Sequence, residues 1–192
     1  TNTASTITVN STKSITISTS GIVNGTSVVN NGTITFNNNS VQLNATNFTN
    51  NASLSWTGST TGTLTIANGG TFTNGGSGTI TNTSGTHAGT IAFAGSGTVS
   101  GTVTFNSKVS LAGAVNFGAG STIASTLNVN SGGSVSTNAP SYASTSTLNY
   151  NSGGSFSRGL EWSATSGTGY PYNVAVSSAT TFDLSAGGTN LT

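Results

Sequence analysis

The sequence predicts an all-β fold: a single right-handed parallel β-helix, or β-solenoid, with about 21 residues and three short strands in each coil. Four stretches share one pattern, which begins loosely at residue 5 and recurs closely at residues 62, 125 and 146, as in "STLNVNSGGSVST". Leu127 and Leu148 of two close copies lie one such interval apart, and Leu64 precedes Leu127 by three such intervals. Because the longer spacing is a multiple of the shorter one, a stacked repeat is favoured over other folds.

The composition agrees with a folded β-protein. Of the 192 residues 32% are apolar and only 3% are charged, with 27 Gly and a formal net charge of +1. Disordered chains usually combine low hydrophobicity with high net charge, which this chain lacks. Thr, which is abundant here, favours strands, while Asn and Gly supply turns.

Short alternating segments follow one another along the chain. The first are residues 6–9, 14–17, 33–36, 63–66 and 102–105, and shorter ones begin near residues 109, 115, 127 and 174. Their apolar residues are predicted to face a core and their Thr or Ser residues to face outward. The predicted inward set is Ile7, Val9, Ile34, Phe36, Leu64, Ile66, Phe105, Leu127, Val129 and Leu148.

Turn signals separate these segments, among them Asn31-Gly32, Gly132-Gly133 and Gly153-Gly154. The same pairs are compatible with hairpins, so an antiparallel β-sandwich is the alternative fold. The Asn-rich segments 37–40 and 46–51 are candidates for ladders in which an amide bonds the same position one coil away. Solvated turns are the other interpretation of these Asn residues.

The chain is predicted to be one domain. Residues 1–157 form the solenoid coils, with an irregular or looped coil near residues 86–107, where small residues break the rhythm. Residues 158–192 form an aromatic-containing loop and the last coil or coils of the same domain.

Charge and cysteine content exclude several functions. Lys13, Lys108 and Arg158 are too few to form a basic patch, so we expect no nucleic-acid partner. The chain has no Cys, and no apolar run approaches the roughly 20 residues of a membrane span. A surface of hydroxyls and amides resists proteases that cut at Lys or Arg, which favours an extracellular or cell-surface location.

Catalytic groups are scarce, and we expect a non-enzymatic protein without cofactor or metal. Glu161 and Asp183, the two carboxylates, are separated by close to one coil of sequence, so neighbouring coils could pair them as in a retaining glycosidase, a remote alternative. Arg158, three residues before Glu161, favours an ion pair with it instead. His87 has no carboxylate or Cys nearby and is expected in a turn or on the surface.

Large side chains with polar tips mark the end of the chain. Trp162, Tyr170 and Tyr172, together with Arg158 and Glu161, are predicted to form a glycan or partner contact on a loop that leaves the coil. The competing interpretation is that Trp162 and Tyr170 plug the solenoid core. Trp56 stands two residues after Leu54 and is predicted to be in the core.

Repeated Thr-x-Thr triplets suggest a different function. They occupy residues 6–8, 33–35, 63–65, 71–73, 79–81 and 102–104. Stacked on one face, their hydroxyls and methyls would order water, so an ice-binding solenoid is the main functional alternative. The triplets keep no constant interval, and Ser often replaces Thr.

The segment from Ser146 to Gly188 resembles a known class of proteins. Its "NYNSGG", "RGLEW" and "GYPYNV" motifs are similar to a segment of giant repetitive surface proteins of Bacteroidetes, which type IX secretion exports. These motifs cover about a quarter of the chain. The resemblance implies a β-solenoid with the role of a cell-surface adhesin. Because uncharged coils stack without like-charge repulsion, we expect the solenoid to be a stiff spacer in an extracellular fibre or adhesin. Self-association, other surface proteins or glycans are its expected partners.

Overall fold

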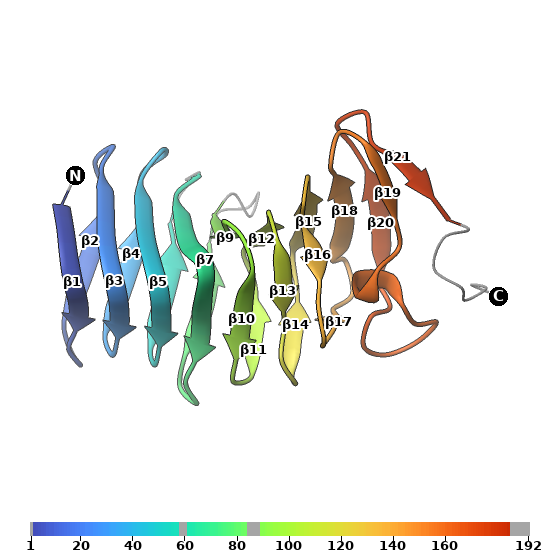
Figure 1. Ribbon diagram of the computed structural model, residues 1–192. Coiled ribbons are helices and arrows are strands. Elements are labelled where there is room, and N and C mark those ends of the chain that lie inside the picture. Colours follow the sequence, from blue (N-terminus) through green and yellow to red (C-terminus); the bar gives the residue numbers. More distant parts are fainter. Residues whose placement is uncertain (1, 58–60, 84–88, 185–192) are drawn as a thin grey trace.

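The computed structural model describes residues 2–57, 61–83 and 89–184. Over these residues the chain forms strands and one short 3-10 helix, η1 (Leu160–Trp162), and all the paired strands run parallel. Figure 1 shows the chain descending along β1 and β3, returning along β2 and β4 behind them, and advancing one coil each time. This is the right-handed sense, so the predicted β-solenoid is confirmed and the antiparallel sandwich is wrong.

One wall of the solenoid, the first wall, runs along the whole described chain. Its strands pair in the order β1 (Asn2–Val9), β3 (Ile22–Asn30), β5 (Gln42–Asn50), β7 (Thr63–Asn74), β9 (Thr90–Phe93), β12 (Lys108–Leu111), β15 (Thr126–Asn130), β18 (Thr147–Asn151) and β20 (Asn173–Val176).

Two further walls complete each coil. In the first coils the long strands bend and their second halves form the second wall, which β10 (Gly97–Ser100), β13 (Ala114–Asn116) and β16 (Ser134–Val135) continue. The third wall contains β2 (Ser14–Ile17), β4 (Thr33–Phe36), β6 (Ser53–Trp56) and β8 (Thr79–Asn82), and beyond them β11 (Val103–Phe105), β14 (Ser121–Ile123) and β17 (Ser141–Tyr142).

The coils differ in length although their average agrees with the predicted repeat. Leu64 pairs with Ile91, Ile91 with Val109 and Val109 with Leu127, so the first of these three coils is half as long again as each of the other two. The interval from Leu64 to Leu127 therefore does contain three coils, but they are unequal. Of the coil expected to be irregular, residues 86–88 lie outside the described residues, and β9, β10 and β11 occupy most of the remainder.

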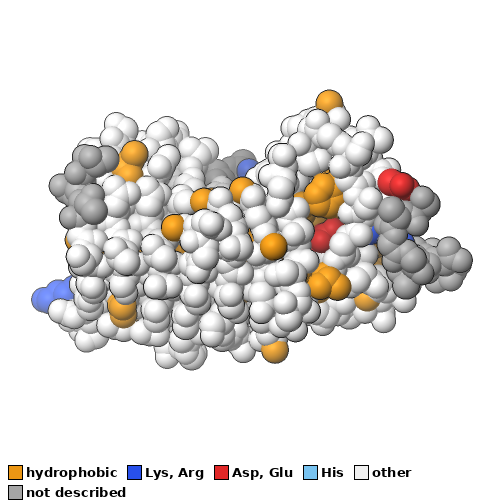
Figure 2. All heavy atoms as spheres, in the orientation of Figure 1, with side chains coloured by type: hydrophobic (Ala, Val, Ile, Leu, Met, Phe, Trp, Pro, Cys, Tyr) orange, Lys and Arg blue, Asp and Glu red, His pale blue; other side chains and the backbone are white. Residues whose placement is uncertain are grey.

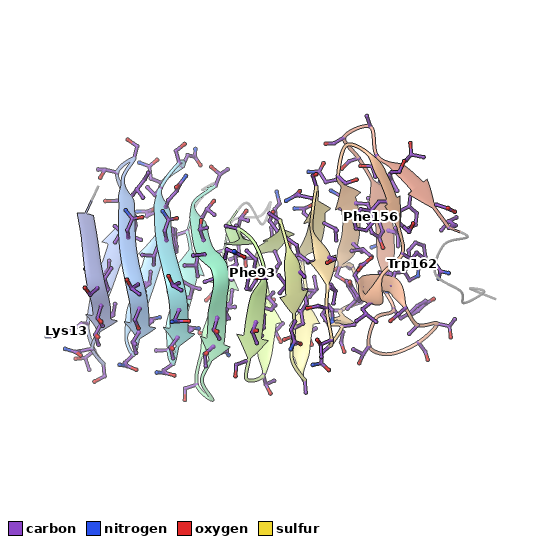
Figure 3. The ribbon with its side chains drawn as sticks, in the orientation of Figure 1. Lys13, Phe93, Phe156 and Trp162 are labelled. Carbon is purple, nitrogen blue, oxygen red and sulfur yellow. The ribbon has the colours of Figure 1, made fainter. Side chains whose placement is uncertain are left out.

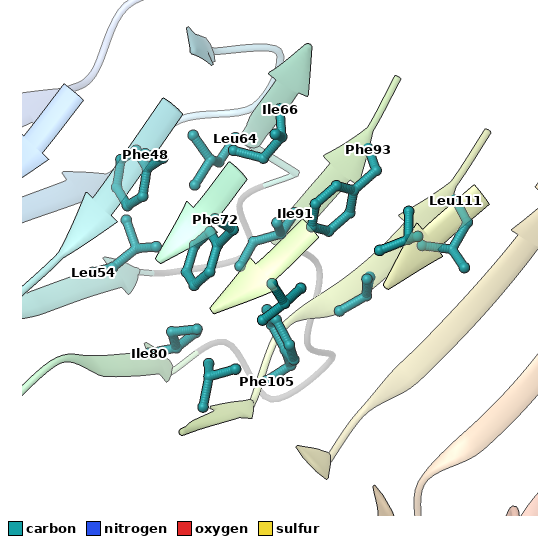
Figure 4. Close-up of a cluster of buried hydrophobic side chains, with 14 of the residues drawn as sticks. Phe48, Leu54, Leu64, Ile66, Phe72, Ile80, Ile91, Phe93, Phe105 and Leu111 are labelled. Atoms are coloured by element: carbon teal, nitrogen blue, oxygen red, sulfur yellow. The ribbon is translucent and has the colours of Figure 1, made fainter. Parts of the chain in front are cut away.

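The inside of the solenoid is an apolar core. Nine of the ten predicted inward residues are buried, and Ile7 in the first coil is partly buried. Figure 4 shows buried side chains such as Leu64, Phe72 and Ile91 stacking from coil to coil. Trp56 is also core, as predicted: its ring stacks on Phe36 at 4.9 Å, and its indole Nε1 donates to the Gly62 carbonyl at 2.8 Å.

Asparagine ladders connect the coils at their corners. The buried Asn30 amide donates to Asn50 at 2.9 Å, and the Asn50 amide donates to Asn74 at 3.1 Å. A parallel ladder joins Asn51 to Asn31 at 2.8 Å. Later coils repeat the arrangement, with bonds from Asn149 to Asn128, from Asn151 to Asn130 and from Asn138 to Asn116. The ladder interpretation of segment 46–51 is thus confirmed for Asn50 and Asn51.

The chain leaves the regular coil after β18. β19 (Ser155–Ser157) pairs with β21 (Thr181–Asp183) in a separate two-stranded sheet, and η1 lies between them in sequence. Figure 1 shows this part at the C-terminal end, where it rises beside the last strands of the first wall. It gathers most of the residues predicted to form a contact site.

Candidate functional site

An aromatic cluster closes the C-terminal end of the core. Tyr150 on β18 is fully buried and lies 5.2 Å from the Phe156 ring and 4.2 Å from the Phe182 ring. Trp162 on η1 stacks on Phe182, with ring centroids 5.9 Å apart and planes 9° apart. Figure 3 shows Phe156 and Trp162 near one another at this end. These rings cover the C-terminal end of the apolar core.

A buried carboxylate lies beneath these rings. Glu161 is 0% exposed, and its Oε1 accepts hydrogen bonds from the Gly159 amide at 2.7 Å and the Tyr150 hydroxyl at 3.0 Å. The Tyr142 hydroxyl donates to the backbone carbonyl of Glu161 at 2.9 Å. Both tyrosines thereby hold η1 against the solenoid, and the hydrogen bonds to Oε1 satisfy one of the two carboxylate oxygens, whereas the buried Oε2 has no hydrogen-bond partner among the described residues.

The electrostatics of the cluster act on the two phenols. Burial raises the pKa of Tyr142 and of Tyr150 well above the ordinary tyrosine value, and the nearby charge of Glu161 raises both further. Arg158 is 9% exposed, and its guanidinium carbon lies 5.8 Å from the centre of the Trp162 ring, within the range of a cation–π contact. The predicted ion pair of Arg158 with Glu161 stays a prediction.

The five predicted contact residues fall into two groups. Arg158 and Glu161 are buried and Trp162 is partly buried, so these three hold the end of the fold together. Tyr170 and Tyr172 are 48% and 61% exposed, on the two sides of the buried Pro171. Only these two of the five are exposed, and the core-plug interpretation fits Trp162 but not Tyr170.

A groove runs beside η1. It has a volume of about 430 Å³ and lies between the corner at Gly118–Ser121, the segment from Thr137 to Ser141, and Leu160, Ser163 and Thr168 of the loop. Its lining is small, hydroxyl-bearing or apolar, with Asn138 the one amide side chain, and includes neither carboxylate. Such a groove can bind a neutral polar chain, but it offers no acid or base for catalysis.

The two carboxylates differ too much in exposure to act as a pair. Asp183 on β21 is exposed, whereas Glu161 is inaccessible to solvent. A polysaccharide therefore cannot reach both groups. Among the described residues no cluster of His, Cys, Asp and Glu could hold a metal ion, and His87 lies outside those residues.

Comparison of the chain with protein-family models, with curated proteins and with solved structures found no match. Within the part of the chain that the structure describes, no helix has the length and apolar character needed to cross a membrane. Function is therefore inferred from the geometry of the solenoid and its surfaces.

Proposed function

We propose that this chain is a non-enzymatic, stiff spacer in an extracellular fibre or cell-surface adhesin. The observation that carries the proposal is the parallel pairing of the first wall, which continues from β1 to β20 through coils of unequal length. Each coil is hydrogen-bonded to the next, so bending the rod requires breaking pairs in several walls at once.

The uncharged surface supports the same role. Figure 2 shows a face that is mostly neutral and polar, with few charged or apolar side chains on it. Stacked coils bring identical positions about 4.8 Å apart, so a charge repeated in every coil would repel its neighbours along the axis. Neutral Asn ladders join the coils without this repulsion and lose little strength at high salt.

Attachment is assigned to Tyr170 and Tyr172, with the groove beside η1 as the neighbouring surface. Exposed aromatic rings stack on sugar faces, and hydroxyl groups in the groove bond sugar hydroxyls. Glycans or other surface proteins are therefore the proposed partners.

A distance measurement tests the stiff-spacer role. Because the chain has no Cys, one Cys at Ser14 and one at Ser155, both exposed, can carry a unique pair of spin labels. A stiff rod gives a single narrow distance distribution that does not change between low and high salt. A broad distribution would contradict the spacer role while leaving the coil structure intact.

Binding and location need separate experiments. Antibodies against the chain should label intact cells of the organism that produces it, and signal only after lysis would contradict a surface location. On glycan arrays and cell-surface extracts, Tyr170→Ala with Tyr172→Ala should reduce binding at least tenfold, whereas Tyr142→Phe, a control at a partly buried tyrosine, should not. Polysaccharide hydrolysis that disappears in Glu161→Gln would contradict the non-enzymatic role.

A further inference from the structure

We propose that the outer face of the third wall is an ice-binding surface. In strands β2, β4, β6 and β8, the side chains that alternate with the core residues are all Ser or Thr. This hydroxyl face consists of Ser14, Thr16, Thr33, Thr35, Ser53, Ser55, Thr79 and Thr81.

The register aligns these residues in two straight files. Ser14, Thr33, Ser53 and Thr79 pair from coil to coil, and so do Thr16, Thr35, Ser55 and Thr81. Neighbours within a file lie about 4.8 Å apart, and the two files lie about 6.6 Å apart, because they are two residues apart along a strand. The face is therefore a two-dimensional lattice of hydroxyl groups with regular spacing.

The triplets in the sequence locate this face only in part. Triplets 33–35 and 79–81 belong to it, whereas triplet 63–65 lies on β7 in the first wall and triplet 71–73 on the second half of β7. The other two strands of the face, β2 and β6, contribute Ser14 with Thr16 and Ser53 with Ser55. The Thr-x-Thr pattern misses both strands because Ser replaces Thr in them. Three-dimensional stacking brings the four rows together although the lengths of chain between them are unequal.

The other two walls lack such a lattice. In the first wall one outward file contains Asn24, Asn44, Thr65 and Ala92, and its neighbour contains Lys108. In the second wall Val29 and Asn47 interrupt the hydroxyl files. The third wall from β2 to β8 thus differs from the first and second walls, because every outward position in its strands has a hydroxyl group.

The chemistry of the face favours ordered water as its ligand. Each hydroxyl can donate one hydrogen bond and accept two, and the Thr methyl groups between them restrict the orientations of adjacent water. Thr35 and Ser55 are bonded to each other at 3.1 Å, so the protein itself fixes the positions of these two neighbouring hydroxyls. The face has no aromatic ring on which a sugar could stack and no charge that would favour a protein or a phosphate.

Freezing-point measurements on the whole chain test this proposal. The expected result is a gap between melting and freezing points above that of an equal concentration of bovine serum albumin, with faceted ice crystals. Thr35→Lys with Thr81→Lys should abolish the gap because the long charged side chains break the lattice. Thr126→Lys with Thr147→Lys, in register on the first wall, is the matched control and should retain the gap.

Each other outcome overturns the proposal. One such outcome is that the unmodified chain shows no gap between melting and freezing points, and another is that both double variants lose the gap equally. A third is that sedimentation velocity detects a dimer, which the substitutions on the hydroxyl face abolish, while no gap is seen. The last result would mean that the hydroxyl face pairs two copies. Circular dichroism and the denaturation midpoint must show that the variants are folded; should the Thr35 variant unfold, Thr81→Lys alone, at an exposed position, replaces it.

Discussion

Asn50 shows how single polar residues fix one coil on the next. Its amide is fully buried and donates to the Asn74 side chain and to the Thr79 carbonyl, both at 3.1 Å, while its oxygen accepts from Asn30. Asn50→Ala leaves partners buried and unsatisfied, so the free energy of unfolding should fall by about 2 to 3 kcal/mol.

Chemical denaturation measures this loss, and the neighbouring ladder supplies the control. Asn51 bonds Asn31 at 2.8 Å in a partly buried position that water can reach. Asn51→Ala should therefore cost at most about 1 kcal/mol. Equal losses for the two variants would show that burial of the Asn50 ladder has no special importance.

The buried tyrosines predict a loss of stability at alkaline pH. Because the folded-state pKa values of Tyr142 and Tyr150 are raised, the unfolded chain releases these protons first. Their contribution is complete below about pH 10 and declines above it, by up to about 1.4 kcal/mol per pH unit for each phenol. Denaturation midpoints between pH 8 and about 11 should show this slope, which Tyr150→Phe should reduce; a slope unchanged in Tyr150→Phe would contradict the prediction.

At the scale of elements, two copies of one motif have different environments. Gly133 and Gly154 occupy the same place in "NSGGS". A Cβ at Gly133 would lie 2.4 Å from the Leu111 carbonyl oxygen of the preceding coil, whereas a Cβ at Gly154 would have no atom within 4 Å. Gly133→Ala should therefore lower the free energy of unfolding by about 1 to 3 kcal/mol, and Gly154→Ala should change it by less than about 0.5 kcal/mol.

Thermal or urea denaturation of the two glycine variants checks this difference. A similar cost at both positions would mean that the second copy also stacks closely on its neighbour and that β19 does not leave the second wall. The two variants thus test the boundary between the regular coils and the C-terminal end.

The sequence predicts the orientation of residues in the regular coils, but it does not predict where the chain leaves those coils. Alternation places Leu64, Leu127 and Leu148 in the core correctly because inward and outward positions depend on local period. The departure of β19 depends on contacts that Tyr150 makes with Phe182 and Glu161, which are distant in sequence. Burial of Glu161 was likewise unpredictable, since a charged residue is expected at the surface unless its partners are known.

The η1 segment should behave as a cap of the core. Trp162 packs on Phe182 and beneath Arg158, so Trp162→Ala should destabilise this end by about 2 to 3 kcal/mol. Tyr170→Ala, at a position that is 48% exposed, should leave stability within about 0.5 kcal/mol. Limited proteolysis near β19 and β21 reports the difference; equal protection in the two variants would argue against the cap.

At the scale of the whole molecule, the fold is one-dimensional. Each coil contacts chiefly the coil before and the coil after it, and the apolar core is continuous along the axis. The chain has two carboxylates in 192 residues, so the proposed role is one of binding and support. The two proposed binding surfaces are the exposed tyrosines at one end and the hydroxyl face along the third wall.

Single-molecule stretching between handles at the two ends tests the stiff-spacer role most directly. A stiff solenoid should extend little until a threshold force, and then lengthen in steps as one coil after another detaches. Each step should lengthen the chain by roughly 60 to 90 Å, the extended length of a short or a long coil less its rise. Smooth extension at low force, without steps, would contradict the stiff-spacer role.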